Sequence, residues 1–205
     1  MNEVEAKDYL KNHLNFTILD IERLETFKSQ LLDFNSNYNL ISDNTLSFIW
    51  TRHVLDSAQL LSLINTKSNA SLIDLGSGAG FPGLIISIFN KNPEFHVKLY
   101  EKSPVKRKFL NIIKEKLKIN VDIRENVYQE KIINADIIVA RAFKKLKEII
   151  RISRETVKKP HKIIILKGKN AQEEINNISL EQNYSYKLVK SITNIDSKII
   201  IVNAK

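Results

Sequence analysis

The sequence predicts an α/β fold with a mostly parallel sheet, preceded by a helical N-terminal part. From about residue 71 onward, short apolar runs alternate with segments of helical periodicity, the pattern of a parallel sheet with crossover helices. A turn with three glycines joins the first apolar run to the helix that follows it. Before the polar linker at residues 65–70, apolar residues recur at helical spacing. We therefore predict a helical extension over residues 1–66, packed on a main domain over residues 67–205.

The extension is expected to contain a helix that starts near Ile18 and is ended by the polar run at residues 35–39. Residues 42–44 offer capping side chains for a further helix over residues 46–63. The second of these helices carries the polar residues Arg52, His53 and Asp56.

Arg52 and Asp56 stand four residues apart in this helix, so they can pair on one helix face. His53 lies in register with apolar residues, a placement more typical of a packed histidine than of a catalytic one. We expect this group either to form the acceptor side of a site or to tie the N-terminal helices to the main domain.

The glycine turn follows an apolar strand over residues 72–75 and precedes a helix over residues 84–89. Glycines at positions 76, 78 and 80 permit positive φ angles and a close approach of a ligand to the main chain. Strand, turn and helix N-terminus are expected to form a cradle with free N–H donors for a nucleotide-type ligand.

Two common nucleotide sites are excluded by the spacing. Gly78 and Gly83 have the separation of a phosphate-binding P-loop, but Leu84 stands where that motif requires lysine. Phe81 occupies the third glycine position of a dinucleotide fingerprint.

The pattern that remains is Asp74-x-Gly76-x-Gly78-x-Gly80, which resembles motif I of the class I S-adenosylmethionine-dependent methyltransferases. The resemblance implies a Rossmann-like, mostly parallel seven-stranded sheet and S-adenosyl-L-methionine as cofactor. Because this ligand has no pyrophosphate, a full phosphate nest is unnecessary. Asp74 is expected to receive the methionine ammonium, directly or through water.

The remaining elements follow in order. A strand over residues 97–101 ends in Glu101, which is expected to bind the ribose hydroxyls. Further helices are expected over residues 104–117, 145–158 and 171–178, and further strands over 120–124, 135–140, 162–166, 184–191 and 198–203, the last two as an antiparallel pair. Polar residues at predicted strand ends gather on one sheet edge, where ligands bind in such folds: Asp74, Glu101, Arg124–Val127, Arg141 and Lys167.

The charge and composition of the chain indicate which kinds of binding partner to expect. The net charge is +9, which suits a polyanionic partner, although a compositional bias of a chain rich in Lys, Asn and Ile is the alternative. Basic residues concentrate in residues 98–118 and 141–169, which favours a basic face. The candidate contacts to RNA phosphates are Lys106, Arg107, Lys144, Lys145, Lys167 and Lys169.

The chain contains no cysteine, which excludes disulfides, thiolate zinc sites and cysteine nucleophiles, and we expect no metal. Its polar, acidic start differs from a signal peptide, and no apolar run approaches the roughly 18 residues of a membrane span. We expect a cytoplasmic protein without membrane contact.

The residues at the predicted strand ends also limit which acceptor atoms the protein could methylate. Pyrimidine C5 methylation usually needs a cysteine nucleophile, and exocyclic amines typically need an Asn/Asp-Pro-Pro-aromatic motif, where this chain has Ala140-Arg-Ala-Phe143. A ribose 2′-OH needs a base; Lys167 is a candidate, but Arg141 stands where that mechanism wants an acid. Guanine N7 is already nucleophilic and needs no base, so it fits best.

Five segments, in order, resemble the bacterial small-subunit (16S) ribosomal RNA guanine-N7 methyltransferases, the glucose-inhibited division protein B family. They are Tyr38-Asn-Leu-Ile-Ser42, Arg52-His-Val-Leu-Asp-Ser57, Ile73-Asp-Leu-Gly-Ser-Gly-Ala-Gly-Phe-Pro-Gly83, Val139-Ala-Arg-Ala-Phe143 and Leu166-Lys-Gly168. One segment, Arg124-Glu-Asn-Val-Tyr-Gln129, departs from the family pattern, which leaves its register open by a residue or two.

The resemblance implies that the methyl acceptor is N7 of a specific guanosine in 16S ribosomal RNA, either as naked RNA or within the assembling small subunit, and we expect a monomer. It places cofactor contacts on Gly76, Phe81, the Asn126-Val127 turn and Arg141. No residue is assigned as catalytic with certainty; the candidates are Arg141, Lys167, His53 and Arg52. Other RNA methyltransferases, including ribose 2′-O enzymes, remain alternatives, as do a small-molecule or protein methyltransferase and a noncatalytic ribosome-binding factor.

Overall fold

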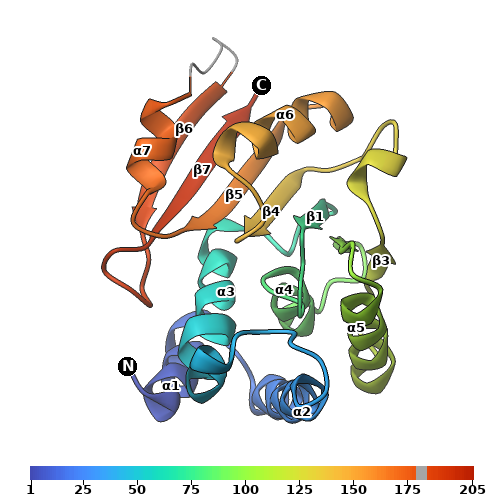
Figure 1. Ribbon diagram of the computed structural model, residues 1–205, viewed down its shortest axis with the longest axis vertical. Coiled ribbons are helices and arrows are strands. Elements are labelled where there is room, and N and C mark those ends of the chain that lie inside the picture. The colour runs from blue at the N-terminus through green and yellow to red at the C-terminus, as the bar shows by residue number, and fades with distance from the viewer. Residues whose placement is uncertain (179–183) are drawn as a thin grey trace.

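The computed structural model describes residues 1–178 and 184–205. Its centre is a seven-stranded sheet in the order β3-β2-β1-β4-β5-β7-β6 (Figure 1). The strands are β1 (Ser71–Leu75), β2 (His96–Tyr100), β3 (Asp122–Arg124), β4 (Ile137–Arg141), β5 (His161–Lys167), β6 (Tyr184–Lys190) and β7 (Lys198–Ala204). β1 to β5 pair in parallel, whereas β7 is antiparallel to both of its neighbours. The predicted Rossmann-like, mostly parallel sheet with an antiparallel closing pair is confirmed.

Helices cover both faces of the sheet. They are α1 (Glu3–Leu14), α2 (Ile18–Asn35), α3 (Asp56–Ala58), α4 (Gly83–Phe89), α5 (Pro104–Leu117), α6 (Leu146–Thr156) and α7 (Ala171–Asn176). Figure 1 shows α6 and α7 on one side of the sheet and the N-terminal helices with α4 and α5 on the other. Successive strand residues point to opposite faces, so Leu72 joins one apolar cluster and Ile73 the other.

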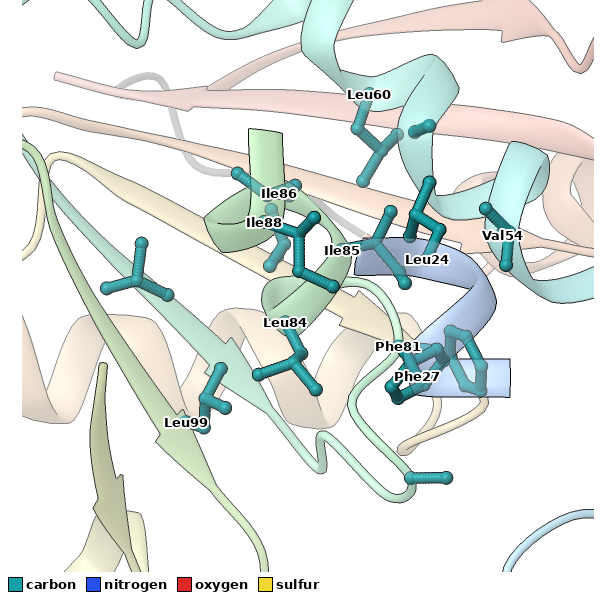
Figure 2. Close-up of a cluster of buried hydrophobic side chains, with 14 of the residues drawn as sticks. Leu24, Phe27, Val54, Leu60, Phe81, Leu84, Ile85, Ile86, Ile88 and Leu99 are labelled. Atoms are coloured by element: carbon teal, nitrogen blue, oxygen red, sulfur yellow. The ribbon is translucent and has the colours of Figure 1, made fainter. Parts of the chain in front are cut away.

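The larger cluster joins the N-terminal helices to the sheet. Figure 2 shows Leu24 of α2 and Val54 and Leu60 of the following helical segment beside α4 and Phe81. All four of these side chains are buried, so the N-terminal helical part covers the same face of the sheet as α4 and α5. The division into residues 1–66 and 67–205 remains a prediction.

Two capping boxes fix the N-terminal helices. Asn2 and Glu5 exchange side-chain and backbone hydrogen bonds at the start of α1, as do Thr17 and Asp20 at the start of α2. At the end of α2, the Asn35 side-chain oxygen accepts hydrogen bonds from two amides of the next loop. The predicted helix from Ile18 and its end at residue 35 are confirmed.

The single helix predicted over residues 46–63 is only partly correct. The segment is helical throughout, but it consists of a 3₁₀ turn at Asp43–Phe48, a π-helical stretch at Ile49–Leu55, the short α3 and a 3₁₀ turn at Gln59–Leu63. A π turn is wider than an α turn, so residues four apart are not aligned on one face. The ion pair of Asp56 is therefore made not with Arg52, as the spacing allowed, but with Arg141.

Candidate active site

The three glycines of the turn after β1 all have positive φ angles, at +77° for Gly76, +57° for Gly78 and +103° for Gly80. At the first of these positions there is also no room for a side chain. A Cβ atom on Gly76 would lie 2.3 Å from Cδ2 of Phe143. The turn therefore depends on glycine for its backbone and, at Gly76, for close packing against the end of β4.

The amides of this turn are used within the protein. The N–H groups of Gly76 and Ser77 donate to the Tyr100 carbonyl at 2.9 and 3.0 Å, and that of Gly78 donates to Glu101 Oε2 at 2.8 Å. The expectation of a cradle with free N–H donors is wrong for these positions. The turn is held against the end of β2, and it presents carbonyls, Cα atoms and side chains to a ligand.

A cavity of about 300 Å³ lies between this turn and the ends of β2 and β4. Its walls come from the glycine turn, the end of β2, the first turn of α5, the loop after β3 and the end of β4, with Leu40 and Ile41 added from the N-terminal part. Predicted cofactor contacts that line it are Gly76, Gly78, Phe81, Glu101, Asn126, Val127 and Arg141. The structure thus brings together residues that are far apart in the sequence.

Asp74 lies behind the cavity wall. Its side chain is fully buried and is not among the residues that line the cavity. Oδ2 accepts a hydrogen bond from the Gly83 amide at 2.9 Å, and Oδ1 has no partner among the described residues. Burial raises the pKa of this carboxyl to about 7. Its observed contact braces the start of α4, in place of the direct ligand contact expected from the motif.

Glu101 is held at the cavity by two backbone amides. Oε2 accepts from Gly78 and Oε1 from Ser103, each at 2.8 Å. A carboxylate has about four lone-pair sites, so acceptor capacity remains for a pair of hydroxyl groups. In the facing loop, the Asn126 side chain accepts from the Tyr128 amide at 3.1 Å, which fixes the turn that carries Val127 into the wall.

Arg141 is the most connected side chain of the site. Its Nη1 donates to the Arg52 carbonyl at 2.8 Å and lies 3.4 Å from Asp56 Oδ2, while Nη2 lies 2.6 Å from His53 Nδ1. The guanidinium also lies over the Phe81 ring, 4.9 Å from its centroid. These contacts tie the 49–56 segment to the end of β4, the structural role considered for that segment from the sequence.

His53 is held as a neutral imidazole. Thr45 donates its hydroxyl hydrogen to the Ser42 carbonyl, so it accepts from His53 Nε2 at 2.9 Å, which leaves Nδ1 to accept from Arg141. Burial, with the nearby charges of Arg141 and Arg52, lowers the pKa of His53 to about 3. The ring stacks on Phe81 with centroids 4.9 Å apart. Both ring nitrogens are therefore used in hydrogen bonds within the site.

The predicted basic contacts divide into two groups. Lys106 and Lys144 line the cavity, and Lys145 and Lys169 are exposed near the same sheet edge. Arg107 donates to the carbonyls of Glu101 and Lys102, and Lys167 donates to the Lys144 carbonyl and to Glu174. These last two side chains are committed to the structure of the strand ends.

Comparison with known proteins decides the family. The family model GidB, described as rRNA small subunit methyltransferase G, matches residues 20–200. The chain belongs to the GidB family. It is 36% identical over 195 residues to ribosomal RNA small subunit methyltransferase G of Orientia tsutsugamushi (strain Ikeda), covering 94% of this chain and 95% of that protein.

A second relative, the protein of the same name from Pelagibacter ubique, is 34% identical over 86% of this chain and 84% of its own length. Among solved structures, Aeropyrum pernix fibrillarin with bound S-adenosyl-L-methionine matches with a TM-score of 0.56 at 15% identity, covering 74% of this chain and 75% of that one. M. jannaschii TYW2 in complex with AdoMet matches with a TM-score of 0.54 at 16% identity, covering 74% of each chain. These two likenesses concern the fold.

Several residues of this GidB cavity were not predicted. Leu40 and Ile41 belong to a segment that carried the family resemblance, but nothing local to them indicates that they reach the glycine turn. Tyr100 and Phe143 also line the cavity. Phe143 fills the space that a side chain at position 76 would occupy. The glycine indicates that some group packs closely there, but only the pairing of β4 with β1 shows that this group is Phe143.

Two absences complete the description of this GidB chain. Within residues 1–178 and 184–205, no group of three or more His, Cys, Asp or Glu side chains is placed to hold a metal ion. Over the same residues, no helix is long and apolar enough to cross a membrane.

Proposed function

We propose that this protein methylates N7 of a guanosine in 16S ribosomal RNA, with S-adenosyl-L-methionine as methyl donor. Membership of the rRNA small subunit methyltransferase G family carries the enzyme class and the RNA substrate. The observation that carries the chemistry is the arrangement around Arg141, where His53 and Lys167, the candidate bases, are both held in other contacts. This favours an acceptor atom that needs no deprotonation.

The candidate bases are each occupied by a contact. His53 uses both ring nitrogens and is held neutral, and Lys167 is bound to the Glu174 carboxylate at 2.9 Å. A ribose hydroxyl must lose its proton to attack, whereas the lone pair of guanine N7 is available without any proton transfer. The protein then contributes mainly alignment of acceptor and donor.

The residues of the first cavity fit the proposed cofactor, which supplies an activated methyl group on a sulfonium. Glycines at 76 and 78 keep the wall free of side chains, and Glu101 offers a fixed carboxylate suited to ribose hydroxyls. We assign the adenosine side to Asn126 and Val127 and the sulfonium side to Phe81 and Arg141. Asp74, behind the cavity wall, acts through its Oδ2, which accepts from the Gly83 amide and fixes the start of α4 beside the glycine turn.

The proposed partners follow from the substrate. We assign phosphate contacts to the exposed or cavity-lining lysines at 106, 144, 145 and 169, and expect the substrate to be free 16S RNA or the assembling small subunit. A cytoplasmic location and a monomeric state agree with this function. Sedimentation of the pure protein tests the monomer.

The test is methyl transfer from radiolabelled S-adenosylmethionine to bulk RNA and to undermethylated small ribosomal subunits, followed by digestion and mass analysis of the nucleosides. We expect label as 7-methylguanosine in 16S RNA. Label on a ribose 2′-oxygen would replace the proposal by the ribose alternative. Tight cofactor binding without RNA labelling would point to a small-molecule or protein acceptor, and no cofactor binding would point to a noncatalytic ribosome-binding factor.

A further inference from the structure

A second cavity of about 230 Å³ lies beside the first one, at the ends of β4 and β5. The two cavities share Arg141 and Ala142 in their walls. The second is completed by Asp56, Leu166, Lys167, Gly168 and Ser197. It is smaller than the roughly 300–1,000 Å³ of ordinary small-molecule pockets, so it suits one ring system better than a whole nucleotide.

Asp56 is the carboxylate of this second cavity. Its Oδ1 accepts hydrogen bonds from Thr193 Oγ1 at 2.7 Å and from Gln59 Nε2 at 2.9 Å. Among the described residues, its Oδ2 has only the long contact of 3.4 Å with Arg141. One oxygen is therefore anchored, and the other keeps acceptor capacity for a ligand in the cavity.

The support of Asp56 is itself rigid. Gln59 is buried, and its Oε1 accepts from the Ile192 amide at 3.0 Å. The loop between β6 and β7 is thereby fastened to the segment that carries Asp56, and the same loop contributes Ser197 to the cavity. A carboxylate positioned by such contacts is pre-organised for recognition, because few degrees of freedom are lost on binding.

We propose that the second cavity binds the target base and that Asp56 recognises guanine through the N1–H and N2–H₂ donors. Arg141 has five N–H donors and lines the same cavity, so its guanidinium complements the O6 acceptor of that edge. N7 lies on another edge of the base and stays free for methylation. Adenine has an acceptor at N1, which faces the carboxylate unfavourably. The negative charge also stabilises the cationic ring formed by N7 methylation.

This inference rests on the proposed function, and the test separates the two. Small subunits are reconstituted with 16S RNA that carries either guanosine or inosine at the labelled position, since inosine keeps N7 but lacks the N2 amino group. The wild-type protein is expected to prefer guanosine by about ten- to a hundredfold in kcat/KM, the range of one hydrogen bond to a charged group. In Asp56→Asn this preference is expected to fall to within about threefold.

A merely structural Asp56 would behave differently. If Asp56 only positions Arg141, Asp56→Asn lowers kcat/KM for both substrates equally and the guanosine preference stays at the wild-type value, which overturns the proposal. Equal use of guanosine and inosine by the wild type also overturns it. Absence of any label on wild-type guanosine substrate is the separate failure of the proposed function. If Asp56→Asn is too slow to measure, Thr193→Val removes one anchor of the carboxylate and should reduce the same preference partially.

A substitution that narrows the second cavity tests whether the target base binds there. Gly168 lines the second cavity, and a Cβ at this position would have no neighbour within 4 Å, so Gly168→Leu adds a side chain at the cavity wall without a clash. We expect unchanged thermal unfolding, unchanged cofactor affinity by calorimetry and a reduction of RNA methylation by a hundredfold or more. The matched control is Gln172→Leu, an exposed site on α7 outside the cavity. Wild-type methylation by Gly168→Leu would overturn the proposal.

Discussion

At the residue scale, the site depends on a few side chains that each contact two or more neighbouring residues. Phe81 packs edge-on against Phe27 on one side and stacks against His53 on the other, while Arg141 lies over its ring. Glu101 joins the glycine turn to the start of α5 through two amides. Removal of one such group is therefore expected to change both the packing and the shape of the cavity.

Gly76→Val is expected to abolish cofactor binding. The φ angle of +77° is strained for a branched residue, and the added Cβ would displace Phe143 from the cavity wall. Calorimetric titration with S-adenosylmethionine measures the effect, and circular dichroism checks that the fold persists. Wild-type affinity in a folded Gly76→Val protein would contradict the placement of the cofactor at this turn.

Because His53 is neutral in the folded state, its contribution to the free energy of unfolding is expected to decrease in mild acid. Its pKa is about 3 in the folded state against 6.5 as the ordinary value, so the unfolded chain binds the extra proton first as pH falls. The stabilisation is complete above pH 6.5 and is progressively lost below it, by about 2 kcal/mol between pH 6.5 and 5.

Urea unfolding of the wild type and of His53→Gln at both pH values measures this contribution as a difference, so that other groups cancel. Asp74 is one of those groups, because its raised pKa acts in the opposite direction between pH 3.8 and about 7. His13→Gln, at an exposed position on α1, is the matched control. Equal pH slopes in wild type and His53→Gln would contradict the assignment of a neutral, buried imidazole.

At the element scale, α2 supports the site from behind. Phe27 on α2 is fully buried and packs against Phe81, with ring centroids 5.5 Å apart (Figure 2). It also packs against Phe109 on α5, with centroids 6.0 Å apart. Arg23, on the same helix, donates to the Leu117 carbonyl at the end of α5. The N-terminal helices thus fix the positions of both the glycine turn and α5.

Phe27→Ala is expected to lower the free energy of unfolding by about 3–5 kcal/mol, the cost of removing a buried aromatic ring and leaving a cavity. Cofactor affinity should fall as well, because Phe81 is no longer supported. Denaturant unfolding and calorimetry measure the two effects. Phe48→Ala, at an exposed position, should change stability by no more than about 0.5 kcal/mol; a similar decrease in both variants would contradict this account.

At the scale of the whole molecule, the net charge is +9, and basic residues concentrate in residues 98–118 and 141–169, the ranges that include the ends of β2, β4 and β5. Acidic side chains form ion pairs with several basic ones. Glu148 on α6, for example, pairs with Lys144 before the helix and with Arg151 within it. Lys145 and Lys169 are exposed, and each directly follows a residue that lines one of the two cavities, Lys144 and Gly168. We expect these two lysines to contact phosphates of the bound RNA.

RNA affinity is therefore expected to fall steeply with salt. In Lys145→Gln/Lys169→Gln the slope of log K against log salt should decrease in magnitude by about 0.7–0.9 for each phosphate that the variant no longer neutralises. Filter binding of 16S RNA fragments at several salt concentrations measures it. Lys11→Gln, on α1, is the control and should keep the wild-type slope. An unchanged slope in the double variant would remove these lysines from the interface.

The sequence by itself determined the order of the elements, the glycine turn and the edge of the sheet at which the site lies. These features depend on local chemistry: apolar periodicity defines strands and helices, glycine defines the turn, and parallel strands bring their carboxyl ends to one edge. For this reason Glu101, Asn126, Val127 and Arg141 were predicted as neighbours before any contact was known.

Only the tertiary structure decided how polar groups are paired. The turn amides bond to the end of β2, Asp74 faces Gly83, and Asp56 reaches across 85 positions to Arg141 and 137 positions to Thr193. The same long-range contacts accompany the change of residues 49–55 from the expected α-helix to a π-helix. A local pattern contains no information about a partner so distant in the chain, because that partner is selected when the packed layers bring the two segments together.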